Sequence, residues 1–272
     1  MATELPPLTP GTLYLVATPI GNLEDITLRA LRVLRGADVI AAEDTRHTAN
    51  LLRHFSIHKP LISYFKFNER RRGEEILDRL QRGQIVALVT DAGTPGISDP
   101  GQRVVASAVR AGLRVEAIPG ACALVAALTA SGLPTDEFHF AGFLPVKSGQ
   151  RSRRLAELTQ LPGTIVLYES PYRVEKLLME FTTLVPDRKV VLARELTKRF
   201  EELLRGSPAD VTAEWKRKPR KGEFVVLVGP RPNDPSSSEN PGAVTRLTDD
   251  QLDREESQLD PIPPQENSPP DP

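Results

Sequence analysis

The chain has 272 residues, of which 39% are hydrophobic and 26% charged, a balance typical of a globular enzyme with two compact domains or one large one. No apolar run approaches membrane-spanning length, and the first residues lack a signal-peptide pattern, so we expect a cytoplasmic protein that does not enter membranes. The single cysteine, Cys122, excludes an intramolecular disulfide and a cysteine-based metal cluster within the chain.

Charge is distributed unevenly along the sequence. Residues 233–272 contain ten acids against Arg246 and Arg254, a net charge of −8, so residues 1–232 carry +7 within the formal total of −1. A basic body indicates an anionic partner, because Lys and Arg side chains that neutralise phosphates supply most of the non-specific affinity for nucleic acid. A well-solvated surface without a partner is the alternative that charge alone leaves open.

The first half of the chain alternates strands with helices. Apolar and β-branched runs predict strands at 12–17, 39–42, 61–64, 85–90 and 114–118. Apolar residues at helical spacing, with Thr27 as an N-cap and Gly36 and Gly83 as stops, predict helices at 28–36, 49–55 and 69–82 and another after Gly101. This alternation implies right-handed crossovers and a mainly parallel sheet.

The second half also combines strands and helices. An Ala- and Leu-rich helix at 121–130 is followed by strands at 138–143, 164–168, 190–193 and 223–228 and by a helix at 174–184. We therefore expect an N-terminal α/β domain over residues 11–120 and a second α/β domain, with a sheet that can be mixed, over 121–229. Residues 230–272 are rich in Pro, Ser, Asp and Glu without an apolar period, which predicts a disordered acidic tail.

The strand at 85–90 leads into a loop of unusual composition. Six apolar or β-branched residues indicate a strand buried on both faces, and residues 91–101 are dense in Gly and Pro and bracketed by Asp91 and Asp99. Ligands of open α/β sheets bind beyond the carboxyl ends of the strands, so this loop is a candidate wall of a binding site. An ordinary turn between strand and helix is the alternative.

Several common catalytic motifs are missing from the sequence. It has no Gly-x-Gly-x-x-Gly after a strand, no Gly-x4-Gly-Lys-Ser/Thr loop, no His-Glu-x-x-His and no Gly-x-Ser-x-Gly, which argues against dehydrogenases, P-loop enzymes, zinc proteases and hydrolases. His54 and His58 lack a third ligand nearby in sequence, so we expect no metal. Cys122, in an Ala-rich helix start, is more typical of packing than of chemistry.

The loops at the strand ends could share one crevice. Their small residues allow backbone groups to approach a ligand closely, as a nucleoside or amino-acid moiety requires. Carboxylates in these loops would give the crevice acidic walls suited to a positively charged ligand, and they are Asp44, Asp91, Asp99, Glu169 and Glu195. Each could instead cap a helix or accept a loop hydrogen bond, and Asp99, before Pro100 and Gly101, is a candidate cap.

Two basic segments accompany these loops. Residues 147–154 combine four cations with a flexible Ser/Gly linker, and residues 216–221 are denser in Lys and Arg. Both segments are candidates for binding the phosphates of RNA, and a solvated loop is the alternative for each.

A set of co-linear motifs resembles one protein family. The motifs are LYLVATPIGNLEDIT at 13–27, AEDTR at 42–46, TDAGTPGISDPG at 90–101, PGACA at 119–123, GFLP at 142–145, YESP at 168–171, ARELTK at 193–198 and KGEF at 221–224. Together they resemble the ribosomal RNA small subunit methyltransferase I family, a branch of the tetrapyrrole-methylase superfamily of S-adenosyl-L-methionine enzymes. The resemblance runs from about Gly11 to Gly229.

The resemblance implies a two-domain α/β fold of the tetrapyrrole-methylase type, or class III methyltransferase, that forms a homodimer and binds S-adenosyl-L-methionine in a cleft between the domains. It implies methyl transfer to the ribose 2′-oxygen of a cytidine in the decoding region of 16S rRNA, as free rRNA or in the small ribosomal subunit. The residues that it places beside the cofactor are Pro19, Ile20, Asp91, Gly93, Thr94, Ile97, Asp99, Ala121, Cys122, Tyr168, Glu169, Leu196 and Gly222.

Methyl transfer to a hydroxyl needs oxygen, methyl carbon and sulfur in line, and a base that takes the hydroxyl proton. Asp44 and Glu195 are the candidate bases. Arg46, Lys147 and Lys198 are candidates for stabilising the developing oxyanion and for binding backbone phosphates.

Two other functions stay open at this point. A methyltransferase acting on a tetrapyrrole or another small substrate belongs to the same superfamily, although TPIGN at 18–22 replaces the Gly-x-Gly-Pro-Gly-Asp loop typical of those branches. A non-catalytic RNA-binding assembly factor could keep the fold without turnover.

Overall fold

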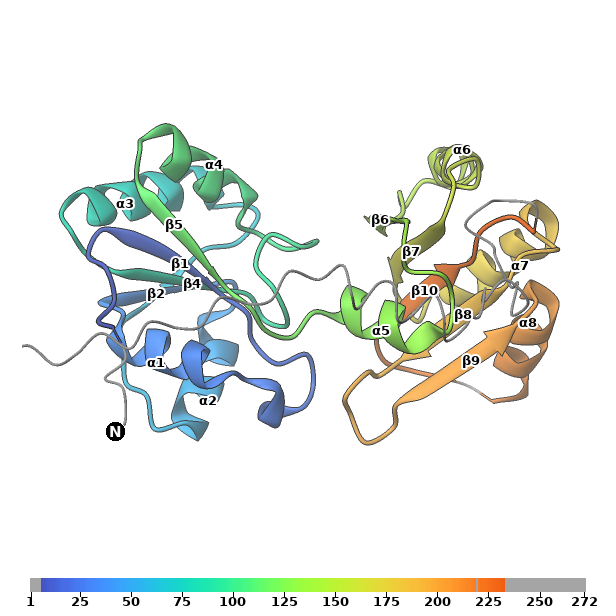
Figure 1. Ribbon diagram of the computed structural model, residues 1–272, viewed down its shortest axis with the longest axis horizontal. Helices are drawn as coiled ribbons and strands as arrows, with labels where there is room; N and C mark the ends of the chain where they lie inside the picture. Colours follow the sequence, from blue (N-terminus) through green and yellow to red (C-terminus); the bar gives the residue numbers. More distant parts are fainter. Residues whose placement is uncertain (1–5, 219, 233–272) are drawn as a thin grey trace, which may run out of the picture. The chain divides into compact units, whose positions relative to one another are not determined.

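The computed structural model describes residues 6–218 and 220–232, and the first of its two sheets is parallel (Figure 1). The strand order is β3-β2-β4-β1-β5, with parallel pairing throughout. The strands are β1 (Thr12–Val16), β2 (Val39–Ala42), β3 (Leu61–Ser63), β4 (Val86–Val89) and β5 (Arg114–Ile118). The expected parallel sheet is confirmed, and the carboxyl ends of its strands lie along one edge.

Helices cover both faces of this sheet (Figure 1). They are α1 (Leu28–Gly36), α2 (Thr45–His54), α3 (Glu69–Gln81) and α4 (Gln102–Arg110). Side chains of α1 and α2 share a core with Tyr14 and Val16, whereas those of α3 and α4 pack in a separate core with Leu13 and Leu88. The central strand β4 is therefore buried on both faces, which explains its uninterrupted apolar sequence.

The second sheet is mixed. Its order is β6-β7-β10-β8-β9, in which β6 pairs with β7 in parallel and the other pairings are antiparallel. The strands are β6 (Phe138–Phe143), β7 (Thr164–Glu169), β8 (Val190–Arg194), β9 (Glu202–Gly206) and β10 (Phe224–Val228). Antiparallel β10 in the middle of the sheet brings residues 222–225 next to the end of β7, where the loop after the strand begins.

Helices also cover both faces of the second sheet. They are α5 (Ala123–Ser131), α6 (Ser148–Leu158), α7 (Val174–Leu184) and α8 (Pro208–Arg217). The last three share one core with alternate residues of β7, β8 and β10, and α5 packs on the opposite face against Val166 and Leu227. The two α/β halves expected from the pattern of strands and helices are thus present, while the domain boundaries at 11–120 and 121–229 stay a prediction.

Three elements differ from the expectation. Residues 147–154 were expected to be a flexible basic linker, but α6 begins there because Leu155 and Leu158 bury its inner face. Strand β9 and helix α8 were not predicted. Helix α8 begins with a capping box, in which Ser207 Oγ accepts the Asp210 N–H and Asp210 Oδ2 accepts the Ser207 N–H, both at 3.2 Å.

The expectations of a tail, of no membrane span and of no metal site can be compared only with the residues that the structure describes. The predicted tail at 230–272 lies outside the described residues except for 230–232. Among the helices that the structure describes, none is both long and apolar enough to cross a membrane. Within the same residues, no group of three or more His, Cys, Asp or Glu side chains could hold a metal ion.

Two arginines of the basic segments are buried inside the protein. Arg151 is 3% exposed, and its guanidinium pairs with Glu180 at 2.5 Å. Arg220 donates to both carboxylate oxygens of Glu202, at 2.8 and 3.0 Å, and to the carbonyl of Glu214 at 2.8 Å. These two arginines stabilise the fold and are not accessible to phosphates. The candidates for phosphate binding in the two segments are therefore their exposed residues, such as Lys147 and Lys216.

Replacing Arg220 tests this division of the basic residues. Arg220→Met is expected to destabilise the protein by roughly 2–4 kcal/mol, because Glu202 and the carbonyl acceptors lose their donor in a partly buried place. Lys216→Met, on the exposed side of α8, should change stability by less than about 0.5 kcal/mol. Urea unfolding measures both, and equal stabilities of the two variants would show that Arg220 has no structural role.

Candidate active site

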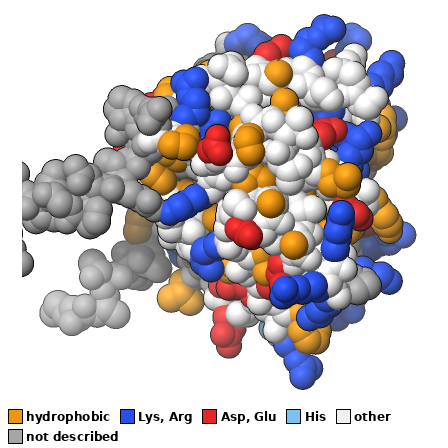
Figure 2. All heavy atoms as spheres, turned by 90° about the vertical axis from the view of Figure 1, so that its right-hand side faces the viewer, with side chains coloured by type: hydrophobic (Ala, Val, Ile, Leu, Met, Phe, Trp, Pro, Cys, Tyr) orange, Lys and Arg blue, Asp and Glu red, His pale blue; other side chains and the backbone are white. Residues whose placement is uncertain are grey.

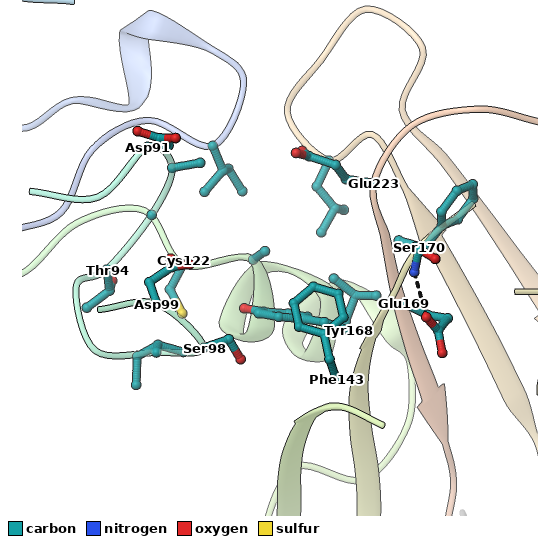
Figure 3. A pocket seen from close by; sticks show the side chains of 18 of the residues that line it. Asp91, Thr94, Ser98, Asp99, Cys122, Phe143, Tyr168, Glu169, Ser170 and Glu223 are labelled. Carbon is teal, nitrogen blue, oxygen red and sulfur yellow. Dashed lines mark hydrogen bonds between the residues drawn. The ribbon is translucent and has the colours of Figure 1, made fainter. Parts of the chain in front are cut away.

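A pocket of about 420 Å³ opens at the carboxyl edge of the first sheet (Figure 3). Loops after β1, β2, β4 and β5 contribute Ile20, Glu43, residues between 91 and 99, Cys122 and Ala123. The second sheet contributes Phe143, residues 168–171, Leu196 and residues 222–225. The volume lies in the range of sites that enclose a small molecule.

The loop after β4 is fixed by its neighbours. Gly93 bridges to Thr18 at the end of β1 through two backbone hydrogen bonds of 2.9 and 3.0 Å. Thr94 Oγ1 donates to the carbonyl of Ala121 at 3.1 Å. Gly93 has φ of +81°, and a Cβ there would lie 3.3 Å from Ile20. Glycine is thus required for the left-handed backbone and for the close approach of two loops.

Three carboxylates line the pocket without a cationic partner. None of the ion pairs among the described residues includes Glu43, Asp91 or Asp99, and the pocket wall itself contains no Lys or Arg in that part of the chain. Burial, together with the charges of Glu43 and Asp91, raises the pKa of Asp99 to about 7. Burial and Asp91 also raise the pKa of Glu43. Desolvated like charges are unfavourable, so this wall suits a ligand that brings positive charge.

Aromatic residues form the facing part of the pocket. Tyr168 Oη accepts the Leu124 N–H at 3.0 Å, and its ring meets those of Phe140 and Phe143 edge to face at 4.9 and 5.7 Å between centroids. Burial raises the pKa of Tyr168, which keeps the hydroxyl protonated. The pocket therefore combines an acidic wall with an apolar one, as expected of a site for an amphipathic ligand.

Glu169 is a buried anchoring residue of the pocket lining, on the far side from Asp91 (Figure 3). Its buried Oε1 accepts the Ser170 N–H at 2.7 Å and pairs with Arg173 at 2.6 Å. Arg173 also donates to the carbonyl of Leu144 at 3.1 Å. This pair fixes the segment that leads from β6 to α6.

The five residues predicted for catalysis lie outside the pocket lining. Asp44 caps α2 by accepting the Arg46 N–H, and its other oxygen pairs with the Arg46 guanidinium, both at 2.8 Å. Hydrogen bonds from Arg46 hold the pKa of Asp44 well below its usual range. The Asp44 N–H donates to Asp91 at 3.0 Å, so Asp44 stands directly behind the acidic wall. Lys147 is the exposed N-cap residue of α6.

Glu195 and Lys198 form an ion pair behind Gly222. Lys198 Nζ lies 3.0 Å from Glu195 Oε1 and 2.8 Å from Glu223 Oε2. Burial opposes ionisation of Glu195, but the Glu223 N–H and Lys198 outweigh it and lower the pKa of Glu195. Gly222 has φ of +117°, and a Cβ there would collide with the Glu195 side chain. Glu195 thus supports the pocket wall at Gly222.

The structure brings together most of the residues predicted to bind the cofactor. The pocket is lined by Ile20, Asp91, Gly93, Thr94, Ile97, Asp99, Cys122, Tyr168, Glu169, Leu196 and Gly222. Pro19 and Ala121 precede two of these residues and are not themselves in the lining. The expectation that Asp99 caps a helix is wrong, since Gly101 is the N-cap residue of α4, and the Asp99 carboxylate is left to the pocket.

Sequence reasoning missed several lining residues. They include Glu43, Ser98, Phe143, Ser170 and Glu223. Glu43 immediately precedes Asp44, but only the placement of β2 beside β4 brings it to the acidic wall. Phe143 lies inside the GFLP motif, which was a sequence signal for this position. The pairing of Phe143 with Tyr168, however, depends on the parallel register of β6 and β7.

Comparisons with known proteins agree with this arrangement. The family model described as Tetrapyrrole (Corrin/Porphyrin) Methylases matches residues 12–212. Ribosomal RNA small subunit methyltransferase I of Halalkalibacterium halodurans is 50% identical over 219 residues, covering 80% of this chain and 75% of that protein. The protein of the same name from Synechocystis sp. is 51% identical over 232 residues, covering 84% and 83%. The chain therefore belongs to the tetrapyrrole methylases and, within them, to the ribosomal RNA small subunit methyltransferase I family.

A solved structure shows the same fold. Uroporphyrin-III C-methyl transferase from Thermus thermophilus, complexed with S-adenyl homocysteine, superposes with a TM-score of 0.56. The two chains are 23% identical, and the match covers 79% of this chain and 96% of that one. The expected two-sheet fold of the tetrapyrrole-methylase type is thus confirmed.

Substituting Gly93 tests its role in shaping the pocket. Gly93→Val should weaken the binding of S-adenosylmethionine, the expected cofactor, about tenfold or more, because the new side chain meets Ile20 between the two loops. Gly112→Val is the matched control: Gly112 has φ of +69° but open space around it, so the variant carries a similar backbone strain of roughly 1–3 kcal/mol away from the pocket. Calorimetry compares the two, and RNA affinity that falls more than cofactor affinity in Gly93→Val would contradict this role.

The pH dependence of stability tests the acidic wall. A carboxyl group with a raised folded-state pKa binds protons more strongly when folded. The ionisation of Asp99 therefore destabilises the protein increasingly from about pH 4, near the ordinary pKa of an aspartate, to about pH 7. Asp99→Asn should therefore raise the melting temperature of the ligand-free protein at pH 8 and bring little gain near pH 4. A gain of the same size at pH 4 and pH 8 would show that Asp99 ionises without cost.

Proposed function

We propose that this protein uses S-adenosyl-L-methionine to methylate the ribose 2′-oxygen of a cytidine in the decoding region of 16S rRNA. The observation that carries the proposal is the pocket, whose unpaired acidic wall and apolar wall are formed by the motifs that the chain shares with its family. Relatives about 50% identical over most of the chain are named for methylation of small-subunit rRNA, which supports RNA as the substrate.

The residues of the pocket fit this cofactor. Glu43, Asp91 and Asp99 supply negative charge that would balance a sulfonium and an amino group, and no cation of the described wall competes for them. Ile20, Tyr168 and their neighbours supply apolar surface for the remainder of the ligand. The cofactor supplies an electrophilic methyl group when bound. The protein's part is to hold it, exclude water and position the hydroxyl.

The hydroxyl proton needs an acceptor near the pocket. Asp44 and Glu195 remain our proposals for the base, and both stand directly behind lining residues. Hydrogen bonds from Arg46 lower the pKa of Asp44, and the Glu223 N–H and Lys198 lower that of Glu195, which weakens both as bases. Asp99 lies in the wall itself with a pKa near neutrality, so we add it as a third candidate. Arg46, Lys147 and Lys198 are proposed to stabilise the oxyanion or to bind phosphates.

A homodimer is proposed on the basis of the family resemblance. The alternative of a small-substrate methyltransferase is supported by fold alone, since the structural neighbour named for such a substrate is 23% identical. The alternative of an RNA-binding factor without turnover makes a different prediction, because it needs no cofactor. Calorimetry separates these functions: RNA affinity without S-adenosylmethionine binding would favour the non-catalytic factor.

Mass spectrometry of 16S rRNA tests the proposed reaction. Cells that lack this protein should lose one ribose methyl group from a cytidine, and the wild-type gene should restore it. Asp44→Asn, Glu195→Gln and Asp99→Asn separate the candidate bases when turnover is measured at saturating cofactor and RNA, with an expected loss of roughly 10²- to 10⁴-fold for the true base. Unchanged methylation in the deletion strain would refute the function, and wild-type turnover of all three variants would refute the catalytic assignment.

A further inference from the structure

The loop between β3 and α3 exposes two phenylalanines. Phe67 is 89% exposed and Phe65 37%, and their rings meet edge to face with centroids 6.3 Å apart. Lys66 between them and Arg70 in the first turn of α3 are also exposed. We call residues 65–70 the aromatic–basic loop. Exposed aromatic side chains are costly in water, so a rigid pair of them beside cations indicates a surface that binds something.

The loop is held rigidly by its own residues. Asn68 Oδ1 accepts the Phe65 N–H at 2.8 Å, and the Asn68 N–H donates to the Phe65 carbonyl at 2.9 Å. Asn68 Nδ2 also donates to the carbonyl of Ser63 at 3.2 Å. Tyr64 is fully buried beneath the loop. The two phenylalanine rings belong to no hydrophobic core cluster of the described residues, so the fold does not require aromatic residues there.

The aromatic–basic loop lies at the same edge of the first sheet as the pocket. The Tyr64 N–H donates to the carbonyl of Ala42, at the end of β2, at 2.7 Å. The loop after β2 is in turn linked to the pocket by the hydrogen bond from the Asp44 N–H to Asp91. Only β2 lies between β3 and β4 in the sheet, so the axes of β3 and β4 are about 10 Å apart. A polymer whose reacting unit enters the pocket from this side would have neighbouring units over the loop.

The chemistry of the loop fits single-stranded RNA. Aromatic rings bind bases by stacking, and cations between them bind the phosphates of the same strand. A nucleotide that enters a pocket is separated from its neighbours in the strand, so an adjacent base is free to stack on a protein side chain. We propose that Phe65 and Phe67 form a stacking platform for a base next to the target nucleotide, with Lys66 on the phosphate backbone. This inference rests on the proposed function.

Substitutions at Phe67 separate stacking from simple apolar contact. The probe is a short, fluorescently labelled, cytidine-containing single-stranded RNA, and its affinity is measured by anisotropy in the presence of S-adenosylhomocysteine. Phe67→Ala and Phe67→Leu should bind it roughly 5- to 100-fold more weakly, whereas Phe67→Trp should keep wild-type affinity because it retains a stacking face. Leu28→Ala is the matched control, since Leu28 is 86% exposed on α1, and it should leave the affinity unchanged.

The salt dependence separates the charge of Lys66 from the platform. Lys66→Ala should reduce the slope of log K against log salt by about 1, and Phe67→Ala should leave the slope unchanged. The wild-type protein and every variant should bind S-adenosylhomocysteine equally and have the same mass in light scattering.

Each other outcome overturns a distinct claim. Wild-type RNA affinity in Phe67→Ala would remove the platform and leave the proposed function intact. A changed mass would assign the loop to a contact between two copies of the chain and would also remove the platform. Absence of RNA methylation by the wild-type protein, with RNA binding still sensitive to Phe67, would refute the proposed function but not the platform.

Discussion

Uncompensated negative charge in a partly desolvated pocket is the constraint on which the site depends. Burial and the charges of Glu43 and Asp91 oppose the ionisation of Asp99, and burial and Asp91 oppose that of Glu43. The described pocket wall offers these carboxylates no cation. The parallel strand order forces this arrangement, because β2 and β4 are neighbours and deliver their acidic loops to one edge. Under the proposed function, a cationic cofactor would offset this unfavourable concentration of negative charge.

The rest of the protein distributes its positive charge away from that wall. Some cations are committed to internal pairs, such as Arg151 with Glu180 and Arg220 with Glu202. Others lie on the surface, where Lys and Arg side chains are dispersed among acidic and apolar ones on the face shown in Figure 2. Under the proposed function, exposed cations would hold an anionic substrate and carboxylates would hold the cofactor, so the two ligands would not compete for the same charges.

Much of the fold was predictable because the signals are local. The apolar run of β4, the Thr27 cap of α1 and the glycine stops each act within a few residues. Helix α8 also has a local signal, the capping box from Ser207 to Asp210. The site was less predictable, since it depends on strand order and register: Glu43 reaches the acidic wall and Arg220 turns inward only through pairings between distant segments. Net charge along the sequence could not distinguish a buried arginine from an exposed one.

Proton release on cofactor binding tests the central claim most directly. If S-adenosylmethionine brings positive charge to the acidic wall, it lowers the pKa of Asp99. At a solution pH just below 7, binding should then release a proton from Asp99. Calorimetric titrations in buffers of different ionisation enthalpy should show a release that disappears well above pH 7 and is smaller in Asp99→Asn. The same heat in every buffer, or proton uptake by the wild-type protein that Asp99→Asn abolishes, would contradict the account.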